Sequence, residues 1–116
     1  MINEFKDIDK LSPKDFEIFV KEVFEAAGWT GTEITKLGKE CKHGDGGVDI
    51  FAFKGKRKFA IEVKQRNLDT MVDVKALNQL VTGAILANVN NKILVTNSYF
   101  TSEVKIRALR LGVELI

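Results

Sequence analysis

Gly44-Asp45-Gly46-Gly47-Val48-Asp49, followed by Glu62-Val63-Lys64, is the pair of stretches that decides the fold of this chain. Lys54-Gly55-Lys56-Arg57 lies between them, separates two apolar runs, and has a glycine where a tight turn needs one. Hairpin loops of two or four residues give the same register, in which the numbers of paired residues sum to 111. Because 49 and 62 also sum to 111, the pattern predicts that Asp49 faces Glu62, with Cβ atoms about 5 Å apart.

The predicted hairpin has one face with charged side chains and one that is wholly apolar. Lys64 lies two residues beyond Glu62, so it shares the carboxylate face at about 7 Å. Facing like charges destabilise a sheet, which favours a bound hard cation with oxygen ligands. The plainer alternative is that Asp49 and Glu62 are solvated surface residues, but Phe51 and Phe53 on the same face argue against it. The opposite face is expected to be core and consists of Val48, Ile50, Ala52, Phe59, Ile61 and Val63.

The composition bounds the class of protein. At 116 residues with 45% hydrophobic and 29% charged residues, residues 1–116 are expected to form one globular domain. No apolar run approaches the roughly 18 residues of a membrane span and the N-terminus is polar, so we expect no membrane partner. The single cysteine, Cys41, excludes an internal disulfide and fits a reducing, cytoplasmic compartment. With one cysteine and one histidine there is no zinc cluster, and no small-molecule cofactor is expected.

The net charge of +2 is small, but its distribution is uneven. Between residues 54 and 66 the only acid is Glu62, against six basic residues: Lys54, Lys56, Arg57, Lys58, Lys64 and Arg66. A basic patch beside an acidic pair suits a polyanionic substrate whose phosphates meet a metal. The alternative is an ordinary solvated surface.

Hydrophobic spacing predicts the order of helices and strands. Ser12 is expected to cap a first helix that Gly28 ends, and Thr70 with Asp73 to cap a second that runs to about Ala87. The buried stripe of this second helix is predicted to be Val74, Leu77, Val81, Ala84 and Ile85. A third helix is predicted over 102–111, and strands over 32–37, 48–53, 59–63, 92–96 and 113–116.

The resulting order is α-β-β-β-α-β-α-β. The hairpin strands are antiparallel, whereas the strands over 59–63 and 92–96 are joined by a helix and should be parallel. The predicted class is therefore α/β, with a mixed central sheet flanked by helices on both faces.

This order, with an aspartate entering one hairpin strand and Glu-x-Lys in the next, resembles the PD-(D/E)XK nuclease superfamily, and within it the Mrr-type restriction endonuclease domain. The matching stretches are Leu11-Ser12-Pro13, Phe16-Glu17, Gly28-Trp29, Gly44 to Asp49, Glu62-Val63-Lys64, Ile93 to Asn97, and Phe100-Thr101. Two features depart from the Mrr pattern. Glu62 stands where Mrr-type domains commonly have glutamine, and the chain leaves no room for a separate DNA-binding domain, which puts target choice in doubt.

The resemblance implies a Mg²⁺-dependent DNA endonuclease of restriction type, with Mn²⁺ as a substitute and modified DNA as one candidate target. Asp49, Glu62 and the carbonyl oxygen of Val63 would hold the cation. Lys64 would orient or deprotonate the attacking water, or stabilise the pentavalent phosphorus. Glu17 lies on the rim of the apolar stripe of the first helix, where the resemblance places a metal-facing glutamate; an ordinary surface acid is the alternative.

Further residues are candidates for contacts with DNA. Lys42, His43 and Arg66 could bind phosphates from the loop and the strand end. Asp45 is either a helper ligand or a turn residue. Gln79 lies off the main stripe of the second helix and either reaches the scissile phosphate or faces solvent.

Two other functions remain open. A structure-selective nuclease such as a Holliday junction resolvase has the same site and a similar size. A catalytically inactive DNA-binding module could retain the fold, although a binder has no need for opposed carboxylates. For either nuclease a homodimer is expected, because cutting both strands of a duplex needs two sites.

Overall fold

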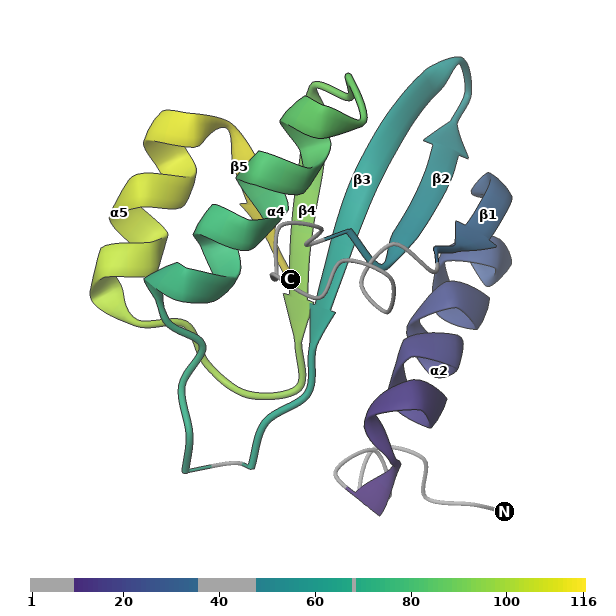
Figure 1. Cartoon of the computed structure of the whole chain (residues 1–116). Helices are drawn as coiled ribbons and strands as arrows, with labels where there is room; N and C mark the ends of the chain where they lie inside the picture. Colours follow the sequence, from purple (N-terminus) through teal and green to yellow (C-terminus); the bar gives the residue numbers. More distant parts are fainter. Residues whose placement is uncertain (1–9, 36–47, 68) are drawn as a thin grey trace.

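The computed structural model describes residues 10–35, 48–67 and 69–116. These contain one five-stranded sheet with the strands in sequential order (Figure 1). The strands are β1 (Thr30–Ile34), β2 (Ile50–Lys54), β3 (Arg57–Lys64), β4 (Asn91–Thr96) and β5 (Val113–Leu115). The helices are α2 (Pro13–Ala26), α4 (Val74–Leu86) and α5 (Ser102–Leu111). The predicted element order and the mixed α/β class are confirmed.

The β2–β3 hairpin has the predicted register. Ile50 pairs with Ile61 and Lys54 with Arg57, so the paired numbers sum to 111 along the ladder. The turn is the two-residue alternative, and Gly55 adopts φ +64°, which glycine tolerates at no steric cost. On the other side of β3, β4 is parallel to it, and β5 is parallel to β4.

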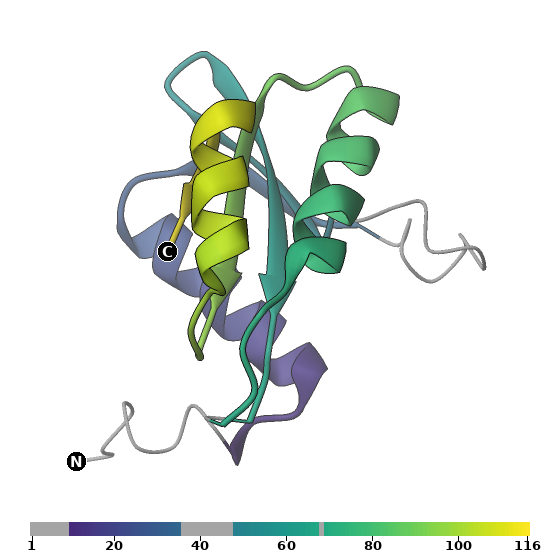
Figure 2. The same cartoon turned by 90° about the vertical axis from the view of Figure 1, so that its left-hand side faces the viewer.

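Helices cover both faces of the sheet (Figures 1 and 2). The core on the α2 side consists of Phe16, Val20, Phe24, Ile50, Ala52, Phe59, Ile61, Ile93 and Val95. The core on the side of α4 and α5 includes Val48, Ala60, Val72, Leu77, Leu80, Leu94, Val104 and Ala108. Successive residues of β3 therefore alternate between the two cores, as a doubly covered strand requires.

The helix ends follow local capping chemistry. The Ser12 hydroxyl accepts the amide of Asp15 at 3.1 Å at the start of α2, and Gly112 ends α5 at φ +68°. At α4 the prediction was wrong in one detail. Asp73 alone caps the helix, accepting the amide of Lys75 at 3.1 Å, whereas Thr70 lies in the preceding loop and accepts the Ser98 hydroxyl through its carbonyl oxygen at 2.6 Å.

Three further predictions need correction. The first strand begins at Thr30, two residues earlier than expected. Ile85 was assigned to the buried stripe of α4 but is 71% exposed, because the face that meets the sheet and α5 is centred on Leu77 and Leu80. Val48 packs in the core on the α4 and α5 side, on the opposite face from Ile50. Within residues 10–35, 48–67 and 69–116, no helix is both long and apolar enough to cross a membrane.

Candidate active site

Asp49 lies one residue before β2, where the regular hairpin ladder stops. Its amide donates to the carbonyl oxygen of Ile61 at 2.9 Å, not to that of Glu62, which explains why the alternation of faces breaks between Val48 and Ile50. Its carboxylate Oδ2 accepts the amide of Val63 at 2.8 Å. Asp49 is therefore held against the backbone of β3 at the residue that follows Glu62.

Glu62 is a buried charged residue, 2% exposed, on the face of β3 that meets α4. Its carboxyl group is within hydrogen-bonding reach of the Asp49 carboxylate, so the two acids are neighbours. Its Oε2 forms an ion pair with Lys64 Nζ at 3.2 Å. Its Oε1 is buried and has no hydrogen-bond partner among the described residues. An ionised carboxylate oxygen in that position is costly unless a group beyond these partners engages it.

The surroundings of Glu62 raise its pKa to about 10. Burial is the largest cause, followed by the hydrogen bond and the negative charge of Asp49; the Lys64 ammonium opposes the shift. Two carboxylates this close in a low-dielectric site repel each other, and the single Lys64 ammonium beside them compensates only part of that cost. The described residues therefore favour a proton on the pair, and a bound cation would supply the same compensation.

Lys64 is held from two sides. Its Nζ lies 3.2 Å from Glu62 Oε2 and donates to Gln79 Oε1 at 3.3 Å, while 23% of its side chain is exposed. Gln79 is half-buried on α4 and faces the site rather than solvent. The sequence left these two orientations of Gln79 open, and packing of α4 on the sheet decides between them.

Thr96 and Asn97 hold the backbone beyond Lys64, a role that the sequence did not reveal. The Thr96 hydroxyl donates to the Lys64 carbonyl oxygen at 2.6 Å. The Asn97 side chain accepts the Arg66 amide and donates to the Arg66 carbonyl oxygen, both at 2.8 Å. The position of these residues at the end of β4, parallel to β3, is the signal that could have found them.

The remaining predicted site residues are not all brought together. Lys42, His43 and Asp45 lie outside the described residues. Glu17 is half-buried on α2, the helix of the other sheet face. In the described part of the chain no three His, Cys, Asp or Glu side chains are grouped closely enough to hold a metal, so Glu17 does not form a triad with Asp49 and Glu62.

The basic run divides into two groups. Lys54, Lys56, Arg57 and Lys58 surround the hairpin turn, at the opposite end of β3 from Lys64 and Arg66 (Figure 1). Lys64 lies six positions after Lys58, which is about 20 Å along a strand. The prediction of one basic patch beside the acidic pair was therefore wrong. At the turn the cations lie over aromatic rings, Lys58 at 4.7 Å from Phe51 and Arg57 at 5.1 Å from Phe59.

The donor set of the site fits a hard divalent cation. Asp49 and Glu62 offer adjacent carboxylate oxygens, and Glu62 Oε1 is a buried acceptor without a protein partner in the described residues. Oxygen-only donors are those that Mg²⁺ and Mn²⁺ prefer, and Mg²⁺ commonly takes one or two carboxylates and fills its remaining positions with water or phosphate.

Comparisons with known proteins identify the family and the fold of the chain. The sequence matches the Mrr_cat restriction endonuclease family model over residues 8–116. The structure of the MspJI restriction endonuclease in complex with a 27-mer oligonucleotide superposes with a TM-score of 0.64 and 20% identity, covering 97% of this chain and 28% of that one. A protein of unknown function, AF1548, superposes with a TM-score of 0.65 and 18% identity, covering 85% and 54%.

At these identities the two structures show a shared fold. The chain spans about half of AF1548 and a little over a quarter of MspJI. No curated protein matches the sequence.

Proposed function

Because the chain belongs to the restriction endonuclease family, we propose that it is a divalent-metal-dependent endonuclease that hydrolyses phosphodiester bonds in DNA. The observation that carries the proposal is the buried Glu62 beside Asp49 and the Lys64 ammonium, with one carboxylate oxygen that has no partner among the described residues. A domain that only bound DNA would pay for burying these charges without using them. The proposed catalytic unit is a single nuclease domain within residues 1–116.

Asp49, Glu62 and the carbonyl oxygen of Val63 would hold the cation, with Mg²⁺ as the preferred ion and Mn²⁺ as a substitute. When bound, such an ion polarises the phosphate and provides a nucleophile at neutral pH. Asp49 is oriented for this role by the hydrogen bond from the Val63 amide, which ties its carboxylate to β3.

Lys64 supplies the positive charge that the protein itself places at the reacting phosphate. An ammonium has three N–H donors, and Glu62 and Gln79 engage two of them. Its side chain is partly exposed, so a further acceptor such as a phosphate oxygen or the attacking water can approach. Donors that are already oriented before the substrate binds stabilise the developing charge without reorganisation.

An activity screen tests the proposed function and identifies the DNA target. Supercoiled, methylated, branched and single-stranded DNA are incubated with the protein and Mg²⁺ or Mn²⁺, with a chelator as control. We expect cleavage of duplex DNA that requires the metal and stops on chelation. Metal-dependent cleavage of branched DNA alone would assign a structure-selective nuclease instead, and no cleavage of any substrate would reduce the chain to a binding module.

Double-strand cleavage implies two active sites, so we propose that the active form is a homodimer. Sedimentation at the concentrations used for cleavage, with and without duplex DNA, tests this arrangement. A monomer that linearises plasmid in a single binding event contradicts it.

The hairpin turn should contribute to DNA affinity without contributing to chemistry. Replacing Lys56, Arg57 and Lys58 with alanine is expected to weaken binding to every duplex, and to lower the slope of log K against log salt by about 1 for each phosphate that the variant no longer neutralises. The turn lies about 20 Å from Lys64, so the maximal rate should be retained.

A matched control removes the same charge elsewhere. Lys105, Arg107 and Arg110 on α5, replaced together by alanine, change the net charge equally but leave the turn intact. If the hairpin variant binds duplex DNA at low salt as the wild type does, the turn has no part in DNA binding.

A further inference from the structure

A polar cavity of about 400 Å³ lies beyond the end of β3, next to the candidate active site. Its lining residues are Leu11, Gln65, Arg66, Asn67 and Thr70. Two of them, Gln65 and Arg66, directly follow Lys64 in the chain, so the wall of the cavity begins one residue beyond Lys64.

Hydrogen bonds within the protein hold four of the lining residues: Leu11, Gln65, Arg66 and Thr70. The Arg66 backbone is held at both its amide and its carbonyl by Asn97, and the Thr70 carbonyl oxygen accepts the Ser98 hydroxyl at 2.6 Å. The Gln65 side-chain amide donates to the carbonyl oxygen of Leu11, which joins the start of α2 to the end of β3. These bonds use backbone groups and the Gln65 amide, so they leave the Arg66 guanidinium largely free to bind a ligand.

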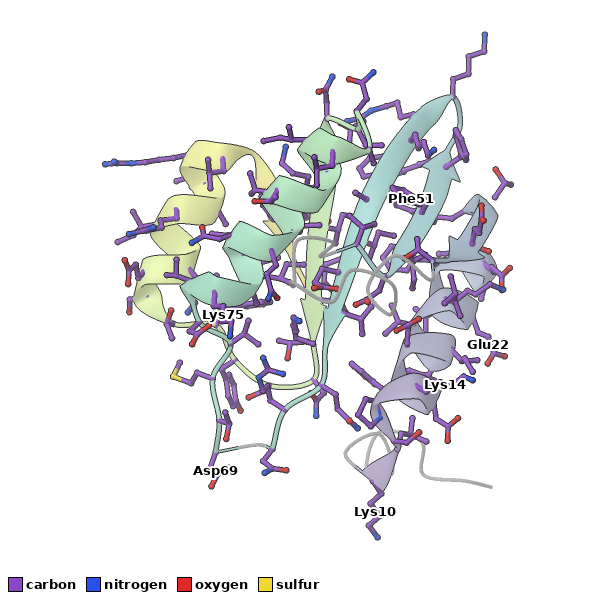
Figure 3. All side chains as sticks on the ribbon, in the orientation of Figure 1. Lys10, Lys14, Glu22, Phe51, Asp69 and Lys75 are labelled. Atoms are coloured by element: carbon purple, nitrogen blue, oxygen red, sulfur yellow. The ribbon has the colours of Figure 1, made fainter. Side chains whose placement is uncertain are left out.

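The chemistry of the lining selects an anion. Arg66 has five N–H donors and uses Nη1 to donate to the Gln65 carbonyl oxygen at 3.0 Å. Its planar fork matches the oxygens of a phosphate. The nearest acid along the loop, Asp69, lies at the loop tip (Figure 3), and its Oδ1 accepts the Thr70 hydroxyl at 3.4 Å.

The lining also argues against a nucleobase. Bases are usually held by stacking on aromatic side chains, and Leu11 is the only apolar wall among the described residues that line the cavity. We propose that this cavity binds the backbone phosphate next to the scissile one on the cleaved strand. The inference rests on the proposed nuclease function, because only a nuclease has a cleaved strand. Arg66 would then be a positioning residue that sets the register of the DNA relative to Lys64.

Binding of a short phosphodiester tests the cavity without any cleavage. The probe is 5′-phosphorylated dithymidylate, titrated without metal while backbone amide shifts are recorded by NMR. We expect the largest shifts at the lining residues Gln65, Arg66, Asn67 and Thr70, and an affinity at least tenfold lower in Arg66→Gln. Arg110→Gln, an exposed arginine on α5, is the matched control and should bind the probe as the wild type does.

Three outcomes would overturn the assignment: equal binding of the probe by Arg66→Gln, equal binding of unphosphorylated thymidine, or equal binding of inorganic phosphate. The last two would indicate a base site and a simple anion site, respectively.

Cleavage supplies a second readout. A single uncharged methylphosphonate linkage beside the mapped cut should raise KM about tenfold for the wild type and change little for Arg66→Gln, which has no guanidinium to bind that phosphate. An equal penalty in both proteins contradicts an interaction between Arg66 and this phosphate. If the wild type cuts no DNA yet the dithymidylate binds as expected, the nuclease proposal fails and the phosphate cavity stands.

Discussion

Lys64→Ala should lower the rate of DNA cleavage by about 10³-fold while the protein still folds and binds duplex DNA. The ammonium lies 3.2 Å from Glu62 and 3.3 Å from Gln79, so it is oriented by the fold and not by the substrate. Alanine removes its charge and its donors at the point where negative charge develops on the phosphate. The two carboxylates remain, so the metal site should survive.

The measurement is single-turnover cleavage of a plasmid at saturating protein and Mg²⁺, which separates the chemical step from binding. Lys105→Ala, an exposed lysine on α5, is the matched control and should cut at the wild-type rate. Circular dichroism and thermal melting establish that both variants are folded. Cleavage by Lys64→Ala at the rate of the control would remove the lysine from the mechanism.

Glu62→Gln should have two effects of opposite sign. In the absence of metal it should make the protein more stable at pH 8, by about 2 kcal/mol, because it removes a buried acid whose charged form is costly. In the presence of Mg²⁺ it should lose the stabilisation that the ion gives the wild type, and cleavage should become undetectable. A change that only damaged the fold would lower stability under both conditions.

The direction of the stability change with pH follows from proton binding by Glu62. The pKa of Glu62 is raised from 4.5 to about 10, so between these values the folded protein holds a proton that the unfolded chain has released. The metal-free wild type must then lose stability as the pH rises through this window, and its maximum lies at the acidic end. Glu62→Gln lacks this group and should show a flatter profile.

Urea unfolding at pH 5, 7 and 9, with chelator and with Mg²⁺, measures both effects. Glu22→Gln, an exposed acid on the outer side of α2, is the matched control and should follow the wild type (Figure 3). A wild-type profile that is flat in chelator would show that Glu62 is not strained by burial. A profile that falls but is not restored by Mg²⁺ would show that the pair does not bind the ion.

Much of the fold was readable because its signals are local. The hairpin register follows from one glycine and two apolar runs, since the turn determines every pair along β2 and β3. The start of α2 follows from Ser12 and the end of α5 from Gly112, because each residue satisfies or allows the terminal backbone groups of its helix within a few residues. These features need no knowledge of distant contacts.

The predictions of burial and of charge clustering were wrong where they depended on residues that are distant in the sequence. Ile85 fits the helical stripe of α4 as well as Leu80 does, and only the position of the sheet and α5 buries Leu80 and exposes Ile85. Val48 fits the period of β2, but Asp49 leaves the ladder to accept the Val63 amide, and the alternation breaks there. The basic residues are close in number but lie at both ends of β3, because an extended chain of that length spans about 20 Å.

The sequence by itself placed Asp49, Glu62 and Lys64 near one another, because all three lie at the open end of one hairpin, but the predicted direct pairing of Asp49 with Glu62 is not part of the ladder, which ends at Ile50 and Ile61. Only the tertiary structure decided how deeply Glu62 is buried, and therefore how far its pKa is raised. The helix α4 covers it, so Glu62 is 2% exposed and Gln79 engages Lys64, and β4 brings Thr96 and Asn97 alongside the next residues of the chain. Strand register is set locally by the backbone of the hairpin, whereas desolvation depends on every residue packed around a group. Desolvation is the largest cause of the raised pKa of Glu62.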